Sequence, residues 1–377
     1  MDHHPAPDHT QSTFELLVSL LQSNPTSIEI LPGDASTWVQ EGTNTFPFLF
    51  IDNNLGVPQK ILYKAFMVGM ANFKLSRRQA LSLTASSQPA IRDLIASSAV
   101  ILLTNPAHQT ALNTRKHLVV QGSLDPSAEL SFTAALLSSQ HCAKESIIWH
   151  HRQWLLRRIY PPSTSDAFED GAHPGCLPIP CIPPDALRKE LGIVTRACEL
   201  YPRNYFAWAH RYFCMRHTLD NLVVNDSAHD EAAYTEIVLG EISNVKQWIE
   251  RHVADFSAVH YLVKLSACAQ DSNFFAATRP SWNSLSFASH AKSLVQSFPS
   301  HEALWMYMRA TALFEVSTDD EDTLEEFSRN FAAPLATPQN EEQLSALYAR
   351  RFLFWLSHTN DVRTNLSIWP EGVFTFF

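Results

Sequence analysis

Arginine and histidine side chains recur at fixed distances from tryptophan in this sequence, and they are the groups best suited to chemistry. The clearest copy is Trp149-His-His-Arg152, and a second is Asn204-Tyr-Phe-Ala-Trp-Ala-His-Arg211. In both copies the arginine follows the tryptophan by three residues. Positions i and i+3 lie on one face of a helix, so the indole and the guanidinium would be neighbours.

The Trp-x-x-Arg pair indicates architecture in preference to catalysis. The indole offers a large area for burial and an N–H that needs an acceptor. The guanidinium can stack on aromatic faces and donate hydrogen bonds to the carbonyls that end a neighbouring helix. An arginine held in this way is not a free charge. We therefore expect structural roles for a set of repeat residues, namely Arg115, Trp149, Arg152, Trp208, Arg211, His260 and Trp305.

The histidines and cysteines do not have the spacing of a metal site. His150 and His151 are adjacent, so on a helix they point about 100° apart and cannot chelate one ion together. None of the six cysteines forms a Cys-x-x-Cys pair. Cys176 and Cys181 flank a proline-rich segment and could pair, although reduced thiols are expected in a cytosolic protein. We expect no metal ligands in this chain.

Composition and charge describe an ordinary globular protein of acidic character. Of the 377 residues, 45% are hydrophobic and 18% are charged, and the formal net charge is −10. Only 10 glycines are present, and no Rossmann fingerprint or P-loop occurs. The absence of a basic block makes nucleic acids and anionic membranes poor partners. No apolar run is long enough to span a bilayer and no signal peptide is evident, which favours the cytoplasm.

The repeated positions must be carried by a series of similar elements. They are Leu112, Trp149, Trp208, Val259 and Trp305, separated by 37, 59, 51 and 46 residues. Such spacing, with loop insertions, is typical of stacked helical hairpins. Each hairpin buries its apolar side only against its neighbours. The predicted fold is all-α, an α–α solenoid forming a right-handed crescent with five repeats.

Proline content and polar segments set the expected boundaries. Residues 1–55 are an N-terminal extension that we expect to be partly disordered, and residues 56–360 form the helical repeat domain. A proline-rich insert at 161–184 interrupts that domain because no helix can cross it. Residues 361–377 form a C-terminal tail. Helix N-caps are expected at three aspartates, Asp125, Asp185 and Asp255.

These repeats resemble those of the protein prenyltransferase α-subunit family over roughly residues 46–316. The resemblance implies an α-type subunit, a crescent of hairpins around a β subunit. The β subunit would hold the zinc ion and the isoprenoid pocket, so no cofactor is expected in this chain. The implied heterodimer transfers a farnesyl or geranylgeranyl group from its diphosphate to a protein cysteine. The implied partner is the β subunit of the Rab-type geranylgeranyltransferase.

The resemblance also implies residues that contact the diphosphate. Lys144 stands five positions before Trp149, and Tyr205 stands three before Trp208, where the family has a lysine and a tyrosine. Arg203 lies beside Tyr205 and could offer a second cation. Lys144 and Tyr205 are the implied catalytic residues, since a positioned ammonium and phenol can stabilise a leaving diphosphate. The alternative for Lys144 is a solvated side chain at a helix start, where the helix dipole disfavours a cation.

Several positions depart from the family pattern and keep a second function open. Leu112 replaces the tryptophan of the first repeat, and Val259 and Leu262 replace the tryptophan and arginine of the fourth. In the fifth repeat Arg309 follows Trp305 by four residues. A non-catalytic helical adaptor that binds a protein partner would tolerate these changes. A tetratricopeptide array fits less well, because its 34-residue period is shorter.

Overall fold

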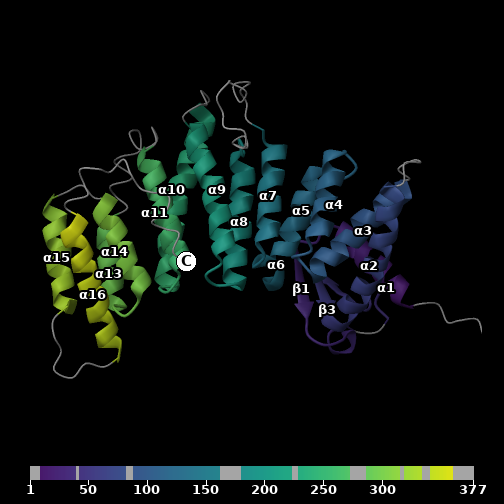
Figure 1. The fold of residues 1–377 in the computed structure, drawn as a ribbon, viewed down its shortest axis with the longest axis horizontal. Coiled ribbons are helices and arrows are strands. Elements are labelled where there is room, and N and C mark those ends of the chain that lie inside the picture. Colours follow the sequence, from purple (N-terminus) through teal and green to yellow (C-terminus); the bar gives the residue numbers. More distant parts are fainter. Residues whose placement is uncertain are drawn as a thin grey trace, which may run out of the picture. The chain divides into compact units, whose positions relative to one another are not determined.

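The computed structural model describes residues 9–39, 42–81, 88–161, 180–222, 228–271, 286–314, 318–332 and 340–359. These ranges are mostly helical, which confirms the predicted all-α repeat fold (Figure 1). The chain divides into two compact units, residues 1–221 and 222–377, a division that the sequence did not predict. The crescent shape and its handedness stay predictions. Within the described ranges, every helix is too short or too polar to cross a bilayer.

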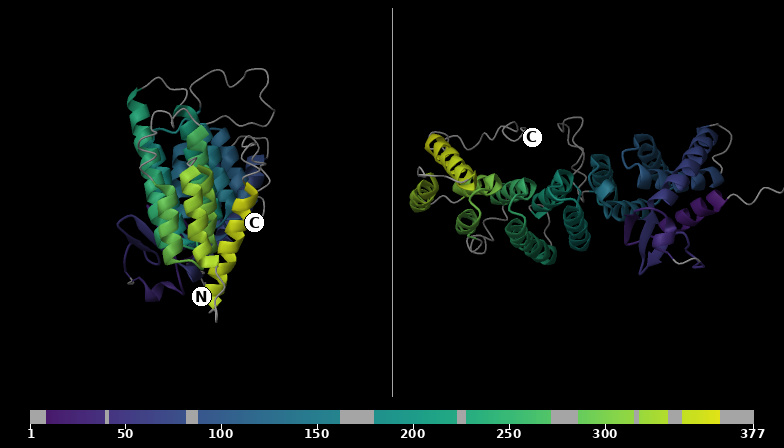
Figure 2. Two further views of the ribbon diagram at one scale, coloured as in Figure 1. Left: turned by 90° about the vertical axis from the view of Figure 1, so that its left-hand side faces the viewer. Right: turned by 90° about the horizontal axis from the view of Figure 1, so that it is seen from below.

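The first unit begins with a helix and a small sheet. Helix α1 (His9–Gln22) is followed by β1 (Ser27–Leu31), the single-turn η1 (Ala35–Thr37), β2 (Leu49–Ile51) and β3 (Asn54–Pro58). Strand β3 is central, parallel to β1 and antiparallel to β2. Figure 2 shows the strands beside α1 at this end of the unit. A Cβ at Gly56 would lie 2.8 Å from Leu31 Cδ1 and 3.1 Å from Leu49 Cβ, so a larger residue there would require neighbouring side chains to shift.

The helices of the first unit follow as antiparallel neighbours (Figure 1). Helix α2 (Gln59–Leu81) packs on α3 (Gln88–Thr104), and α3 packs on α4 (Gln109–Val120). Helix α5 (Pro126–Leu137) packs on α7 (Ser146–Ile159), with the short α6 (Gln140–Ala143) between them. Helices α8 (Pro184–Leu200) and α9 (Tyr205–Leu222) complete the unit.

Two of the three predicted N-caps are confirmed. Asp125 Oδ2 accepts a hydrogen bond from Ala128 N at 2.8 Å, and Asp255 Oδ1 accepts from Ser257 N at 3.0 Å. The cap predicted at Asp185 is wrong. Helix α8 already begins at Pro184, whose fixed φ suits the first helical position, so Asp185 lies inside the first turn.

The helices described in the second unit, residues 222–377, follow in chain order. They are α10 (Ala228–Arg251), α11 (Phe256–Asp271), α13 (Phe287–Ser297), α14 (Glu302–Phe314), α15 (Thr318–Ala332) and α16 (Asn340–Thr359). Trp305 anchors the core between α14, α15 and α16, with ring centroids 5.7 Å from Phe331 and 6.1 Å from Phe352. The predictions for 1–8, for 162–179 in the proline-rich insert and for 360–377 lie outside the described residues.

Candidate functional site

Two buried arginines of the first unit, Arg115 and Arg152, each bind two neighbouring helices at once. Arg152 on α7 donates from Nε and Nη2 to the two carboxylate oxygens of Glu190 on α8, both at 2.7 Å. Its Nη1 donates to Leu130 O at 2.7 Å and to Thr133 Oγ1 at 2.9 Å, both on α5. The guanidinium therefore ties its own hairpin to the following one, in the bidentate geometry that arginine favours.

The same arrangement occurs one hairpin earlier. Arg115 on α4 donates from Nε to both oxygens of Glu129 on α5 at 3.0 Å. Its Nη1 donates to Ile95 O at 2.9 Å and to Ser98 Oγ at 3.0 Å, both on α3. Arg115, Arg152, Glu129 and Glu190 are all at most 3% exposed. We call Arg115–Glu129–His151 and Arg152–Glu190–His210 the two ladder triads.

A buried histidine completes each ladder triad. His151 Nε2 lies 2.8 Å from Glu129 Oε1, and His210 Nε2 lies 3.0 Å from Glu190 Oε2. Neither Nδ1 atom has a hydrogen-bond partner among the described residues. An imidazolium would leave a buried N–H without an acceptor, so the neutral ring that donates from Nε2 is favoured. Burial accordingly lowers the pKa of both histidines, despite the carboxylate beside each ring.

The glutamates of the ladder triads stay ionised. Burial by itself raises the pKa of Glu129, but the Arg115 guanidinium and the His151 hydrogen bond outweigh it and lower that pKa to about 2. Burial acts on Glu190 in the same direction, and Arg152 and His210 lower its pKa to about 2 as well. Each triad thus holds one buried ion pair with a neutral histidine.

One ladder triad also contains a possible set of metal ligands. Glu190, His210 and Cys214 are buried and bring their ligand atoms within 4.8 Å of one another. Both oxygens of Glu190 already accept hydrogen bonds from the Arg152 guanidinium. A divalent cation would have to displace that fixed positive charge from the same carboxylate. The cluster therefore does not fit a resident metal ion.

The sequence reasoning missed the glutamates. Glu129 stands 20 residues before Trp149, and Glu190 stands 18 before Trp208, each followed by a leucine. A glutamate at a near-constant offset within an apolar helical pattern was the available signal. In the second unit Glu241 stands 18 before Val259, and its Oε1 accepts from the Tyr261 hydroxyl at 2.5 Å. Tyrosine there takes the place of the ladder histidine.

The repeat tryptophans are buried, and two of them donate to the turn before their own helix. Trp149 Nε1 donates to Ala143 O at 2.8 Å, and Trp305 Nε1 donates to Pro299 O at 2.7 Å. Trp208 is 4% exposed, with the Arg211 guanidinium 5.5 Å from its ring centroid. His260 is half-buried, and burial followed by the Lys264 charge lowers its pKa.

The expected diphosphate residues come from two turns that share one carbonyl. Ala143 O accepts a second hydrogen bond, from Asn204 Nδ2 at 2.8 Å. Ala143 directly precedes Lys144, and Asn204 stands between Arg203 and Tyr205. Asn204 is 1% exposed, and its Oδ1 accepts from Ala207 N at 3.1 Å, which caps α9. This buried amide fixes the backbone of both turns beside each other.

The three side chains themselves remain on the surface. Lys144 ends α6 and is exposed, and Tyr205 opens α9 and is 60% exposed. Arg203 is exposed and has a φ of 60°, the left-handed conformation that non-glycine residues adopt infrequently. Lys144 is the C-cap of α6 and directly precedes Glu145, the N-cap of α7, so it lies at a helix start, where the α7 dipole disfavours a cation. Two cations and a phenol are thus available at one edge of the first unit.

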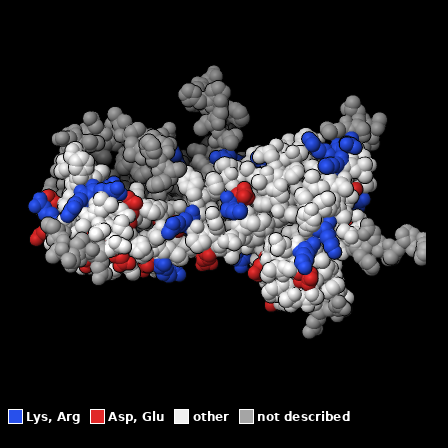
Figure 3. Space-filling model, turned by 60° about the horizontal axis from the view of Figure 1, so that its bottom comes forward, with Lys and Arg blue, Asp and Glu red and all other residues white. Residues whose placement is uncertain are grey.

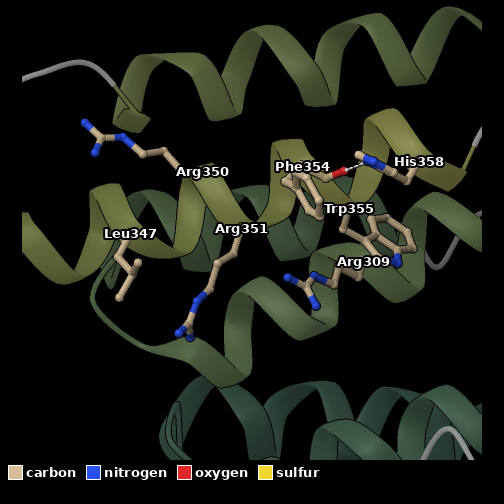
Figure 4. Close-up of a pocket in the computed structure, with 7 residues that line it drawn as sticks. All are labelled: Arg309, Leu347, Arg350, Arg351, Phe354, Trp355 and His358. Atoms are coloured by element: carbon tan, nitrogen blue, oxygen red, sulfur yellow. Dashed lines mark hydrogen bonds between the residues drawn. The ribbon is translucent and has the colours of Figure 1, made fainter.

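A separate cationic groove lies in the second unit between α14 and α16. Its volume is about 660 Å³, and it is lined by Arg309, Leu347, Arg350, Arg351, Phe354, Trp355 and His358. Figure 4 shows Arg309 and Arg351 on the same side of α16, with Arg350 on the other. Arg309 Nε is buried without a hydrogen-bond partner among the described residues, and the guanidinium lies 5.8 Å from the Trp355 ring centroid.

Comparison with known proteins identifies relatives of the repeat. A family model described as the protein prenyltransferase alpha subunit repeat matches residues 187–218, which confirms the resemblance predicted from the sequence. Protein prenyltransferase alpha subunit repeat-containing protein 1 of Homo sapiens is 30% identical over 223 residues, covering 58% of this chain and 49% of the relative. Its Xenopus laevis counterpart 1-A and its Danio rerio counterpart are each 28% identical, over 71% of this chain and 64% of the relative. The chain therefore spans about half to two-thirds of these relatives' lengths.

Proposed function

We propose that this chain, which carries the protein prenyltransferase α-subunit repeat, is the α-type subunit of a heterodimeric protein prenyltransferase. The proposed partner is the β subunit of a Rab-type geranylgeranyltransferase. The pair would act in the cytoplasm and transfer a geranylgeranyl group from its diphosphate to a cysteine near the C-terminus of a substrate protein. The chain would scaffold the β subunit and help to bind the diphosphate, and it would be inactive alone.

The observation that carries this proposal is the shared carbonyl of Ala143. Its hydrogen bonds from Trp149 and Asn204 hold Lys144 next to the Arg203–Tyr205 turn. The matched repeat at 187–218 contains Tyr205, so this residue lies within the segment that the family model matches. A site that collects a cation, a phenol and a second cation at an exposed edge suits a diphosphate contacted from the α side.

The chemistry required of these residues is charge stabilisation. As the thiolate sulfur bonds to the first isoprenoid carbon, the carbon–oxygen bond breaks and the diphosphate leaves with the electron pair. Lys144 would offset the charge that develops on the leaving oxygen, and the Tyr205 hydroxyl would donate a hydrogen bond to it. Arg203 would bind the diphosphate in both the ground state and the transition state. Zinc in the β subunit would supply the activated thiolate.

Co-expression with the Rab-type β subunit tests the proposal. The expected result is a complex that co-purifies and transfers a fluorescent geranylgeranyl analogue to a protein with a C-terminal cysteine. Lys144→Ala should leave the complex intact and lower the transfer rate by about 10²–10³-fold, the range seen when one transition-state donor is removed. Lys144→Arg should restore part of the rate. Lys189→Ala, which removes an exposed lysine on α8, is the matched control.

The outcomes distinguish a role in binding the β subunit from a role in the transfer reaction. A stable complex with unchanged transfer in Lys144→Ala would remove Lys144 from the diphosphate site. Tyr205→Phe keeps the ring and removes only the hydroxyl, so an unchanged rate there would remove the phenol. A chain that binds no prenyltransferase β subunit would exclude the α-subunit function altogether.

A partner-binding adaptor is the second candidate function, and the groove between α14 and α16 favours it. Arg309 is half-buried, and burial lowers its pKa, while Glu302 acts in the opposite direction and nearby Arg351 lowers it further. Glu302 is the one carboxylate paired with these arginines among the described residues, at 3.2 Å from Arg351 Nη1. Excess positive charge beside Trp355 and Phe354 suits an acidic peptide with an aromatic side chain.

The groove can be tested independently of transfer. A fluorescent peptide of alternating aspartate and phenylalanine should bind the chain, and the same peptide with lysine in place of aspartate should not. Arg309→Gln should weaken binding, whereas Arg329→Gln, an exposed change on α15, should not. Equal binding of the acidic and basic peptides would exclude the groove as an acidic-peptide site.

A further inference from the structure

The outer face of α2 carries a continuous stripe of cations and apolar side chains. Residues at intervals of three and four along this helix are exposed, and they fall within a sector of about 120°. We call this set the α2 stripe: Lys60, Tyr63, Lys64, Met67, Ala71, Lys74, Leu75 and Arg78. The opposite face, with Leu62, Ala65 and Phe73, is buried. The helix is thus anchored by one side and presents the other.

The charge of the stripe is of one sign. No acidic residue occurs in Gln59–Leu81, although the whole chain has a net charge of −10. Lys60 pairs with Asp34 at 3.6 Å. Lys64, Lys74 and Arg78 form no hydrogen bond or ion pair with the residues that the structure describes. Three cations on the stripe are therefore free to meet an external anion.

Large apolar side chains lie between the cations. Tyr63 is 62% exposed, Met67 is 55% exposed and Leu75 is 57% exposed. The cations concentrate at the two ends, Lys60 and Lys64 at one and Lys74 and Arg78 at the other. Figure 3 shows two groups of basic side chains, separated by uncharged surface, on the part of the molecule formed by the N-terminal elements. From Lys60 to Arg78 the stripe is about 27 Å long.

We propose that the α2 stripe is a peripheral docking surface for an anionic lipid bilayer. Protein–protein interface cores are depleted in lysine, and this surface carries three lysines and an arginine, grouped at its two ends. A bilayer accepts the same mixture, because lysine stems extend to the anionic headgroups while tyrosine, methionine and leucine enter the boundary layer.

This proposal departs from the expectation that anionic membranes are poor partners. That expectation came from the lack of a basic block in the sequence. Lys64 and Lys74 are ten residues apart in the chain, and the helix places them on one face. The inference does not depend on the prenyltransferase proposal, since it requires only the surface of α2.

Vesicle co-sedimentation of the full chain tests the stripe. The chain should bind phosphatidylcholine vesicles that contain phosphatidylserine and should not bind vesicles of phosphatidylcholine alone. Binding should weaken between about 0.01 M and about 1 M salt, as the Debye length falls from about 30 Å to about 3 Å. Binding that ignores phosphatidylserine, or its complete absence at low salt, would overturn the proposal.

A triple variant identifies the surface responsible. Lys64→Gln, Lys74→Gln and Arg78→Gln together should lower the vesicle partition coefficient on the order of 100-fold, at about 5-fold per cation. The matched control changes Arg92, Lys189 and Arg196 to glutamine, which removes the same charge from exposed positions on α3 and α8. An equal loss in the control would assign binding to net charge and overturn the proposal.

Two further measurements separate the apolar contribution from the charge and the bilayer from a protein partner. Met67→Gln should weaken binding without changing its salt dependence, because it removes apolar contact and leaves every charge in place. Equal thermal midpoints for all variants would show that they are folded. The chain should also bind vesicles when complexed with a prenyltransferase β subunit. Loss of binding in that complex would place the stripe in the subunit interface and overturn the proposal.

Discussion

Glu190 illustrates what the arginines of this chain do at the scale of single residues. Its carboxylate is 2% exposed and takes two hydrogen bonds from Arg152 and one from His210. A buried carboxylate without its cation is strongly unfavourable. Arg152 therefore compensates a charge that the next helix brings into the core, and its position is set by packing.

Replacing Arg152 with leucine should lower the free energy of unfolding by about 3–5 kcal/mol, because Glu190 would remain buried without its cation. Urea denaturation measures this change. The double variant Arg152→Leu/Glu190→Leu should lose less than the single variant, since apolar side chains would then fill the site. A double variant less stable than Arg152→Leu alone would contradict this account of the ladder triads.

The ladder triads also predict acid sensitivity. His151 and His210 have a lower pKa in the folded chain, so the neutral rings stabilise the fold above the unfolded pKa of about 6.5. That contribution decreases as the pH falls below about 6.5. Glu129 and Glu190, with folded pKa values of about 2, contribute stability that is lost as the pH falls from about 4.5 towards 2.

The free energy of unfolding should therefore fall in two steps as the pH is lowered, the first from the histidines and the second from the glutamates. Urea midpoints measured at several pH values test this. In His151→Gln/His210→Gln the first step should shrink and the second should remain. Stability that rises as the pH falls from 7 to 5 would contradict the proposed protonation states.

At the scale of elements, the candidate site depends most on the contact between the start of α9 and the turn after α6. Asn204 accepts from Ala207 N and donates to Ala143 O, so one buried amide caps α9 and binds the turn after α6. Trp149 donates to the same carbonyl from α7. Three helices thus fix the backbone that presents Lys144 and Tyr205.

Asn204→Ala should lower the free energy of unfolding by about 1–3 kcal/mol, because the helix loses its cap and a buried carbonyl loses one donor. Asn204→Asp keeps the cap acceptor and removes the donor. The aspartate variant should therefore retain α9 while it loosens the Ala143 turn. Thermal unfolding and the transfer assay together measure these effects. Full transfer activity in both variants would show that the Asn204–Ala143 contact is not needed for function.

Local signals in the sequence predicted helices and their caps well, but they predicted contacts between residues far apart in the chain poorly. Asp125 and Asp255 could be predicted as caps because a cap needs only the next three residues. The three-stranded sheet could not, because β1 and β3 pair across residues 27–58 and each strand is short. Glu129 and Glu190 were hard to recognise as core residues, since a single carboxylate within a helix ordinarily faces solvent and only their offset from the next repeat tryptophan marked them. Their arginine partners lie in different hairpins.

The same contrast applies to the candidate site. Lys144, Arg203 and Tyr205 could be named from the repeat motif, one turn at a time. Their common location depends on Asn204, whose amide reaches a carbonyl 61 residues away. Such a contact follows from the stacking of hairpins, which sequence spacing alone does not determine.

At the scale of the whole molecule, the chain consists of two compact units with separate anchors. Trp149 donates to Ala143 O within the first unit, and Trp305 donates to Pro299 O within the second. Each indole is at most 2% exposed. Units with their own cores commonly unfold in separate transitions.

Calorimetry should therefore resolve two transitions. Trp149→Phe should lower the midpoint of one, and Trp305→Phe should lower the midpoint of the other, each by removing a buried hydrogen bond that contributes about 0.5–1.5 kcal/mol. The two variants serve as controls for each other. One transition shifted equally by both substitutions would indicate that the units unfold together.

The Arg152–Glu190 ion pair has a consequence for where the chain could be cut or circularly permuted. It joins residues 38 positions apart, on either side of the proline-rich insert, so this contact between α7 and α8 does not depend on the chain segment that connects them. Lengthening a loop costs little, about 0.6 kcal/mol for each doubling. The chain could be cut within this insert, and one fragment would then carry Arg152 and the other Glu190, so the two could still form the buried ion pair. The insert is therefore the natural place for a circular permutation or a split-protein reporter.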